Sequence, residues 1–178
     1  MATHTLPQQQ AKFTGLVDFL PASHAVPAGK VREIYEKSKH RVYSLAFWMT
    51  DNELEAEELC ANVFGRAFSA TNEPSLEMID RALVNELRES RPIGTLTLSC
   101  TEAKEVCQIR ANTKRVHLER AVVQLPATER LIFLLHDVVQ RDHTSISIGR
   151  LLGLSESESR HGLHQARLRM RELLAAMI

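Results

Sequence analysis

The chain has 178 residues, and its 22 lysines and arginines balance its 22 aspartates and glutamates. A net charge of zero argues against a protein that coats nucleic acid through bulk positive charge, although it leaves room for a local basic face. Hydrophobic residues make up 44% of the chain and aromatic residues only 5%. This composition excludes a wholly disordered chain and favours a helical protein over a β-sandwich.

The N-terminus and the cysteines indicate the compartment. Residues 1–10 lack the basic stretch and apolar run of a signal peptide, and no apolar run in the chain is long enough to span a bilayer. The three cysteines form no CxxC pair, which fits reduced thiols better than a disulfide framework. We therefore expect a cytoplasmic protein without a membrane span.

The first 29 residues are expected to be mostly a tail. They contain three prolines, a glutamine run and few charges. Apolar residues between positions 13 and 20 allow one short helix that docks elsewhere on the protein.

Three amphipathic helices are predicted within residues 30–91, the first expected domain. In each helix, apolar residues recur at steps of three and four. Asp51 or Asn52 can cap the second helix, and glutamates fill its opening turns, where the helix dipole favours acids. The predicted bounds are about 31–49, 51–68 and 75–91.

The sequence changes character in residues 92–117, which we predict to be an interdomain linker. Residues 93–99 have a β-like pattern but no partner strand, so an extended conformation is expected there. Residues from 102 onward are expected to be partly helical.

Four more helices are predicted in residues 118–178, the second expected domain, and the last two form a helix-turn-helix. Gly153 gives the turn its backbone freedom, Gly149 allows close helix approach, and Ser155 can cap the following helix. The predicted bounds are 118–124, 128–139, 145–152 and 156–177.

The last helix carries side chains that suit a major groove, because arginine binds phosphate and guanine through paired hydrogen bonds. Glutamates at positions 156 and 158 oppose tight DNA binding at the start of this helix. Their alternative role is to stabilise the helix by interacting with the positive end of its dipole. The alternative is an ordinary helical pair with a solvated arginine face. The candidate DNA-binding residues are Ser155, Ser157, Arg160, His161, His164, Gln165 and Arg167.

No residue set suggests an enzyme or a bound cofactor. His161 and His164 are one helical turn apart, but no acid or cysteine completes a metal site at a suitable spacing. No nucleophile or phosphate loop accompanies the acid–base pairs that can be drawn, so neither catalysis nor a small-molecule substrate is expected.

Two blocks of the chain resemble bacterial RNA polymerase sigma factors. Residues 118–138, LERAVVQLPATERLIFLLHDV, resemble the opening of region four, and residues 148–155, IGRLLGLS, are similar to its helix-turn-helix. Residues 55–68, EAEELCANVFGRAF, resemble region two. The order and separation of the blocks match the small two-domain extracytoplasmic-function (ECF) group, and together they cover about two thirds of the chain.

The resemblance implies a non-enzymatic protein that binds core RNA polymerase and promoter DNA. In this family region two holds the polymerase clamp and opens the downstream promoter element, whereas region four reads the upstream element. An anti-sigma factor is an expected further partner. The polymerase-binding residues that the resemblance implies are Asp51, Glu55, Glu57, Glu58 and Asn62.

The chain departs from the family pattern at several positions. Ala61 and Asn62 replace a usual Gln-Glu pair, and Gly162 and Glu158 replace a frequent Arg and a usual Thr. Residues 75–91 lack an aromatic side chain and a basic track, which capture of a single strand requires. Two other hypotheses therefore stay open: a degenerate sigma-like interaction module, and a stand-alone helix-turn-helix regulator that uses residues 118–178.

Overall fold

The structure, a computed structural model, describes residues 28–70, 74–98, 113–139 and 144–177. Every regular element in these ranges is a helix, so the predicted all-α class is confirmed. Residues 1–27 of the expected N-terminal tail and residues 102–112 of the predicted helical part of the linker lie outside the described residues. The elements are α1 (Ala28–Thr50), α2 (Glu53–Ser69), α3 (Leu76–Ser90), α4 (Arg115–Val123), α5 (Ala127–Phe133), the π-helical turn η2 (Leu134–Val138), α6 (Ser145–Leu152) and α7 (Glu156–Ala176).

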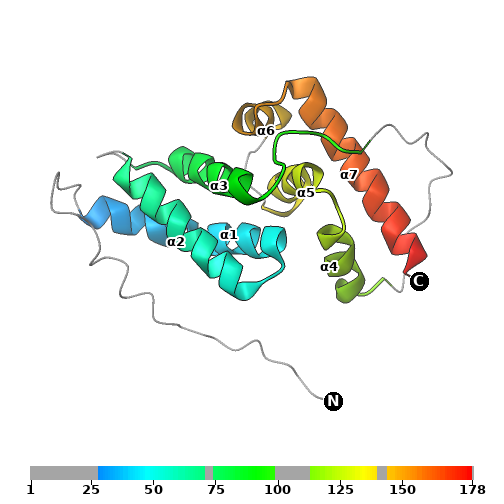
Figure 1. Ribbon diagram of the computed structural model, residues 1–178, viewed down its shortest axis with the longest axis horizontal. Coiled ribbons are helices and arrows are strands. Elements are labelled where there is room, and N and C mark those ends of the chain that lie inside the picture. The colour runs from blue at the N-terminus through cyan, green and yellow to red at the C-terminus, as the bar shows by residue number, and fades with distance from the viewer. Residues whose placement is uncertain (1–27, 71–73, 99–112, 140–143, 178) are drawn as a thin grey trace, which may run out of the picture.

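Helices α1, α2 and α3, here called the N-terminal group, pack together at one end of the molecule (Figure 1). Asn52 caps α2, because its side-chain oxygen accepts hydrogen bonds from the backbone N–H of Leu54 and Glu55 at 2.9 and 3.3 Å. Arg41 of α1 and Asp80 of α3 form an ion pair that is about nine-tenths buried. The cap fixes the start of α2, and the ion pair joins α1 to α3.

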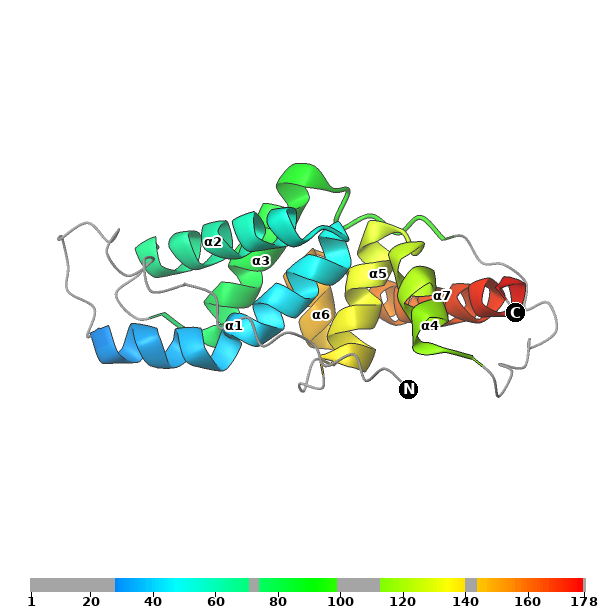
Figure 2. The same ribbon diagram turned by 90° about the horizontal axis from the view of Figure 1, so that it is seen from below.

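Helices α4 to α7, the C-terminal group, lie at the other end, as Figure 2 shows from below. The long α7 packs against α4, α5 and α6. Leu131, Ile132, Ile148 and Ala166 are almost completely buried and supply the apolar centre of this packing. Helix α4 begins three residues before its predicted start, and η2 continues α5 as one wider turn.

The segment from Pro92 to Leu98 follows α3 and lies on α5 of the C-terminal group. Thr128 Oγ1 donates to the Pro92 carbonyl at 3.0 Å and accepts from the Gly94 N–H at 3.1 Å. One carboxylate oxygen of the fully buried Glu129 accepts from the N–H groups of Thr97 and Leu98 at 2.5 and 2.7 Å. These bonds fix residues 92–98 of the predicted linker to α5.

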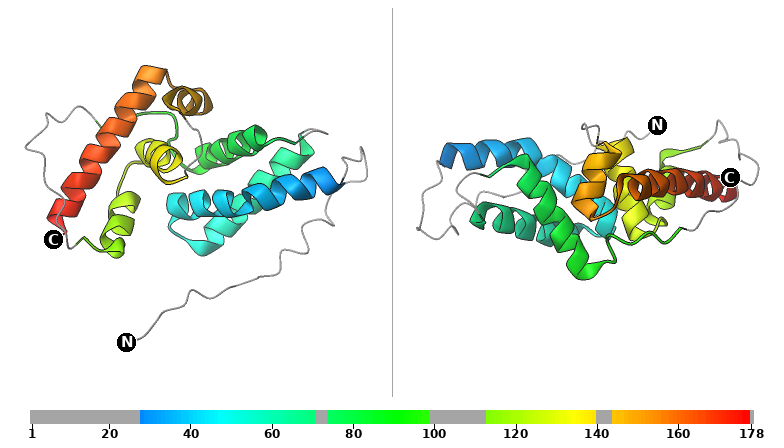
Figure 3. Two further views of the ribbon diagram at one scale, coloured as in Figure 1. Left: turned by 180° about the vertical axis from the view of Figure 1, so that it is seen from behind. Right: turned by 90° about the horizontal axis from the view of Figure 1, so that it is seen from above.

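The two groups contact each other through α1 with α4 and α5 and through α3 with α6. The further views in Figure 3 show α6 beside the end of α3. Arg130 of α5 donates to the carbonyls of Trp48 and Met49 at the end of α1, at 3.3 and 3.4 Å. Buried apolar side chains of both groups belong to one cluster.

Candidate nucleic-acid and protein-binding surfaces

The turn between α6 and α7 has the geometry that its glycines predict. Gly153 adopts a left-handed conformation with φ of +72°, and the Leu154 N–H donates to the Gly149 carbonyl at 2.8 Å. A Cβ atom on Gly149 would lie 2.8 Å from the Leu154 carbonyl oxygen, so a larger residue would push α6 away from the turn. Both predicted glycine roles are confirmed.

Ser155 and Glu158 form a capping box at the start of α7. Ser155 Oγ accepts from the Glu158 N–H at 3.1 Å, and the Glu158 carboxylate accepts from the Ser155 N–H at 2.8 Å. The hydrogen bond from the Ser155 side chain is the main cause of the lowered pKa of Glu158. The predicted cap is therefore present, and the Ser155 side chain is directed to its own helix.

The remaining DNA-binding candidates divide between two faces of α7. Ser157, Arg160, His164 and Arg167 are exposed and recur at three- and four-residue steps, so they form one stripe along the helix. Gln165 is only 4% exposed and faces the interior. His161, half-buried, borders the stripe. The structure thus gathers four candidates on one surface, and the burial of Gln165 removes it from that surface.

Two arginines of this stripe are held by carboxylates. Arg160 pairs with Glu156 one turn earlier on α7. Arg167 donates from Nε and Nη2 to the two carboxylate oxygens of Asp137 in η2, at 2.9 and 2.6 Å. The Arg167 hydrogen bonds are the main cause of the lowered pKa of Asp137, and His136 at 2.8 Å adds to the effect. A DNA phosphate would compete with Asp137 for Arg167.

Gly162 is buried beneath the segment that follows α3. A Cβ atom there would lie 2.8 Å from side-chain atoms of both Ile132 and Leu96. An arginine at this position, frequent in the family that the sequence resembles, would displace Leu96. Glycine at position 162 therefore leaves the space in which Leu96, and with it residues 92–98, packs on the C-terminal group.

The acidic candidates of α2 face in different directions. Glu55 points toward Arg91 at 3.4 Å, whereas Glu57 lies near Tyr43, whose pKa is raised mainly by burial and further by Glu53 and Glu57. The candidates Asp51, Glu58 and Asn62 are also exposed. Leu54 lies between these acids with 77% of its surface exposed.

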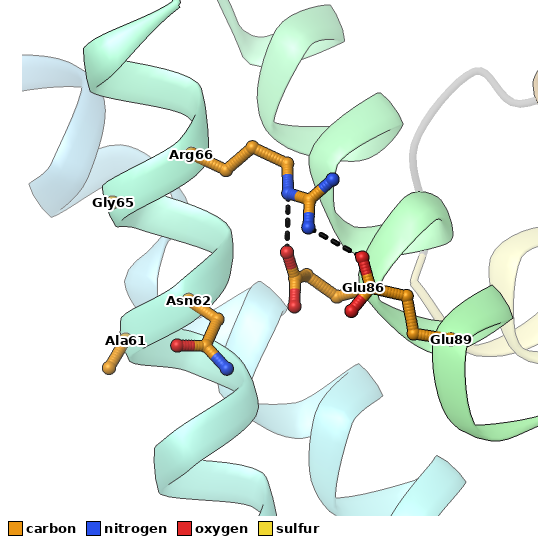
Figure 4. Close-up of a pocket in the computed structure, with 6 residues that line it drawn as sticks. All are labelled: Ala61, Asn62, Gly65, Arg66, Glu86 and Glu89. Carbon is orange, nitrogen blue, oxygen red and sulfur yellow. Dashed lines mark hydrogen bonds and ion pairs between the residues drawn. The ribbon is translucent and has the colours of Figure 1, made fainter.

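A shallow groove with a volume of about 480 Å³ lies between α2 and α3 and is lined on the α2 side by Asn62 and its neighbours. Figure 4 shows Arg66 extending from α2 to two carboxylates of α3. Its Nε lies 2.5 Å from Glu86 and its Nη2 lies 2.6 Å from Glu89. Ala61 and Gly65 also line the groove, so two small residues and a cluster of three charged side chains lie next to Asn62.

Sequence reasoning missed the residues that join distant segments. Arg88 donates to the Leu152 carbonyl at 2.8 Å, Arg130 reaches the end of α1, and Glu129 binds the segment after α3. The sequence offers one signal for them: Thr128, Glu129 and Arg130 are three consecutive polar residues inside an otherwise apolar helix. Periodicity cannot supply their partners, which lie 31 or more positions away.

The described part of the chain contains no group of three histidine, cysteine, aspartate or glutamate residues that could hold a metal ion. No helix among the described residues has the length and apolar character needed to cross a membrane. No protein-family model matches the chain, and no curated protein matches it significantly.

Proposed function

We propose that the chain is an ECF-type sigma factor, which binds core RNA polymerase and directs it to a class of promoters. The observation that carries the proposal is the exposed stripe of Ser157, Arg160, His164 and Arg167 on the helix after a tight, glycine-dependent turn. Such a helix is the reading element of helix-turn-helix proteins, in which the second helix enters the major groove.

A second surface supports a partner other than DNA. Helix α2 presents four exposed acidic side chains and an exposed leucine, which together would repel the phosphate backbone and suit a basic protein surface. In the proposed function this surface binds core polymerase. A small chain with an arginine stripe and an acidic helix at separate sites can bridge DNA and polymerase, as the proposal requires.

The degenerate interaction module remains the second candidate, because one observation favours it. The arginines of α3 and its end are occupied: Arg81 pairs with Glu77, Arg88 with the Leu152 carbonyl, and Arg91 with Glu55. Such a helix offers little charge to a separated DNA strand. In this second function the chain binds polymerase or an anti-sigma factor without opening promoters.

Run-off transcription with purified core polymerase and a template library randomised upstream of the start site tests the choice. The sigma function predicts transcripts from a sequence-defined subset of templates. Replacing Arg160 with alanine should lower their yield about tenfold, the loss expected for one base or phosphate contact.

Arg169→Ala is the matched control, because nine residues along an α-helix place Arg169 on the side opposite Arg160. It should leave the yield unchanged. Binding to core polymerase without any template-specific transcript would instead favour the interaction module. A purely cytoplasmic location and an anti-sigma partner belong to the same proposal.

A further inference from the structure

Two arginines join the helix groups by binding the carboxyl ends of helices. Arg88 of α3 donates to the carbonyl of Leu152, the last residue of α6, at 2.8 Å. Arg130 of α5 donates to the carbonyls of Trp48 and Met49 in the last turn of α1. Carbonyls at a helix end lack partners within the helix and carry partial negative charge, so they favour a cation.

The Arg88 guanidinium lies against two glycines with positive φ. A Cβ atom on Gly153, φ +72°, would lie 3.6 Å from its Nη2, and one on Gly94, φ +105°, would lie 3.8 Å away. The Cβ of Gly94 would also lie 3.1 Å from the Leu152 oxygen that Arg88 binds. Glycine at position 94 therefore keeps the carbonyl accessible to the arginine.

Apart from these arginines, the groups are joined by apolar packing, since buried side chains of both belong to one cluster. Contacts within each group are together much more extensive than the contacts of α1 with α4 and α5 and of α3 with α6. Arg130 keeps its bonds to the Leu125 carbonyl, at 2.9 and 3.1 Å, inside its own group. Opening would therefore cost Arg130 only part of its hydrogen bonding, whereas Arg88 would lose the bond to Leu152.

The covalent connection suits a hinge at Arg91 and Pro92. Arg91 belongs to the N-terminal group, since its N–H donates to the Leu87 carbonyl at 2.9 Å and its side chain reaches Glu55. The Pro92 carbonyl is already bound by Thr128 of α5. Residues 92–98 would therefore move with the C-terminal group, so the bend falls at the link between Arg91 and Pro92, where the Ile93 N–H donates to the Arg91 carbonyl at 2.8 Å.

From these contacts we infer that Arg88 is a latch that keeps the free chain closed, with the turn before α7 held against α3. Release of the latch lets the groups rotate apart about Arg91 and Pro92. The latch itself stands on contacts within the free chain. Its use as a switch rests on the proposed function: a protein that reads two separated promoter elements must hold its two DNA-binding halves apart.

Pulsed electron paramagnetic resonance on the free, full chain tests the latch. Spin labels are placed at the exposed positions of Lys37→Cys on α1 and Arg171→Cys on α7, with Cys100 and Cys107 changed to serine. Cys60 can stay, because burial raises the pKa of its thiol to about 12 and it is nearly inaccessible. Helix content by circular dichroism verifies that each variant is folded.

The closed chain should give one narrow distance distribution. Arg88→Met should add a longer-distance population at least about tenfold larger than in the unsubstituted chain, the effect of losing one hydrogen bond from a charged group. Gly94→Ala should do the same from the carbonyl side. Arg81→Met is the matched control: Arg81 is on the same helix but pairs only within it, with Glu77, so the distribution should stay narrow.

The latch is overturned if Arg88→Met and Gly94→Ala leave the distribution of the unsubstituted chain unaltered, or if Arg81→Met broadens it equally. A broad, long-distance distribution in the unsubstituted chain also overturns it. None of these readouts involves polymerase or promoter DNA, so failure of the latch and failure of the proposed function are observed separately.

Discussion

Individual polar residues inside this protein bind backbone more often than they bind each other. Arg130 is surrounded by carbonyl oxygens, and burial is the main cause of its lowered pKa. One carboxylate oxygen of Glu129 accepts two backbone N–H groups, whereas its other oxygen is buried without a hydrogen-bond partner among the described residues. Burying polar groups of this kind is costly, so they position the segments they bind rather than add much stability.

Replacing Glu129 with alanine should therefore release the segment after α3. The N–H groups of Thr97 and Leu98 lose their acceptor, which should lower the free energy of unfolding by about 2 kcal/mol. Hydrogen exchange at these two amides should be faster in the variant than in the unsubstituted chain, and the increase should be larger than at amides within α5. Glu119→Ala is the control: this exposed residue pairs only within α4, with Arg115, so a change below about 0.5 kcal/mol is expected. Unchanged exchange at Thr97 and Leu98 would contradict the assigned role of Glu129.

Gly162 provides a second test at the residue scale. Arginine at this position must displace Leu96 and should lower the free energy of unfolding by about 1–3 kcal/mol, as overpacking does. The same substitution at Gly65, where a Cβ would meet no atom within 4 Å, should be neutral or raise stability by up to about 1 kcal/mol. Urea denaturation measures both variants. Equal free energies of unfolding for the Gly162→Arg and Gly65→Arg variants would show that Gly162 is not packed beneath Leu96.

At the scale of elements, the helices begin and end where local chemistry dictates. Asn52, Ser75 and Ser155 each cap the helix that follows, and Gly153 ends α6. These positions can be read from the sequence because caps and left-handed glycines act within three or four residues. The π-helical turn η2 cannot, since α-helix and π-helix share the same apolar composition over five residues.

Helix α7 is held to η2 by the Arg167–Asp137 pair, which makes a pH-dependent contribution to stability. The pKa of Asp137 is lowered in the folded chain from its ordinary value of 3.8. A lowered folded pKa means that the contribution is present above about pH 4 and is lost as the pH falls through the folded value.

Asp137→Asn should consequently destabilise the protein at pH 7 and have progressively less effect below pH 4. The same substitution in an Arg167→Met background should have little effect at either pH, because the partner is already absent. The measurement is a double-mutant cycle. Denaturation curves are recorded at pH 7 and pH 3 for the unsubstituted chain, the two single variants and the double variant. An effect of Asp137→Asn that is the same at pH 7 and pH 3 would contradict this account.

At the scale of the whole molecule, the sequence predicts the all-α class and most helix bounds within three residues, because apolar side chains recur with the helical period. It predicts the outward stripe of α7 less well: Gln165 is a polar candidate, yet it lies one turn after the buried Gly162 on the same side of the helix. In that prediction the polar side chain of Gln165 is given more weight than its position in the helical repeat.

The arrangement of the two groups could not be predicted. It depends on bonds such as Arg88 to Leu152 and Arg130 to Trp48, which join residues 64 and 82 positions apart through backbone carbonyls. A carbonyl is present at every residue, so no residue type marks the acceptor. The zero net charge of the chain likewise hides a separation between the acidic residues of α2 and the arginines of α7.

The affinity of the full chain for purified core RNA polymerase tests the central proposal most directly. The unsubstituted chain should bind, and neutralising Glu55, Glu57 and Glu58 together to glutamine should weaken binding at least about tenfold at low salt, where charge complementarity acts most strongly. Neutralising Glu33, Glu36 and Glu119, each of which pairs with a residue of its own helix, is the charge-matched control and should leave the affinity unchanged. No binding by the unsubstituted chain, or equal binding by the triple variant, would contradict the proposal.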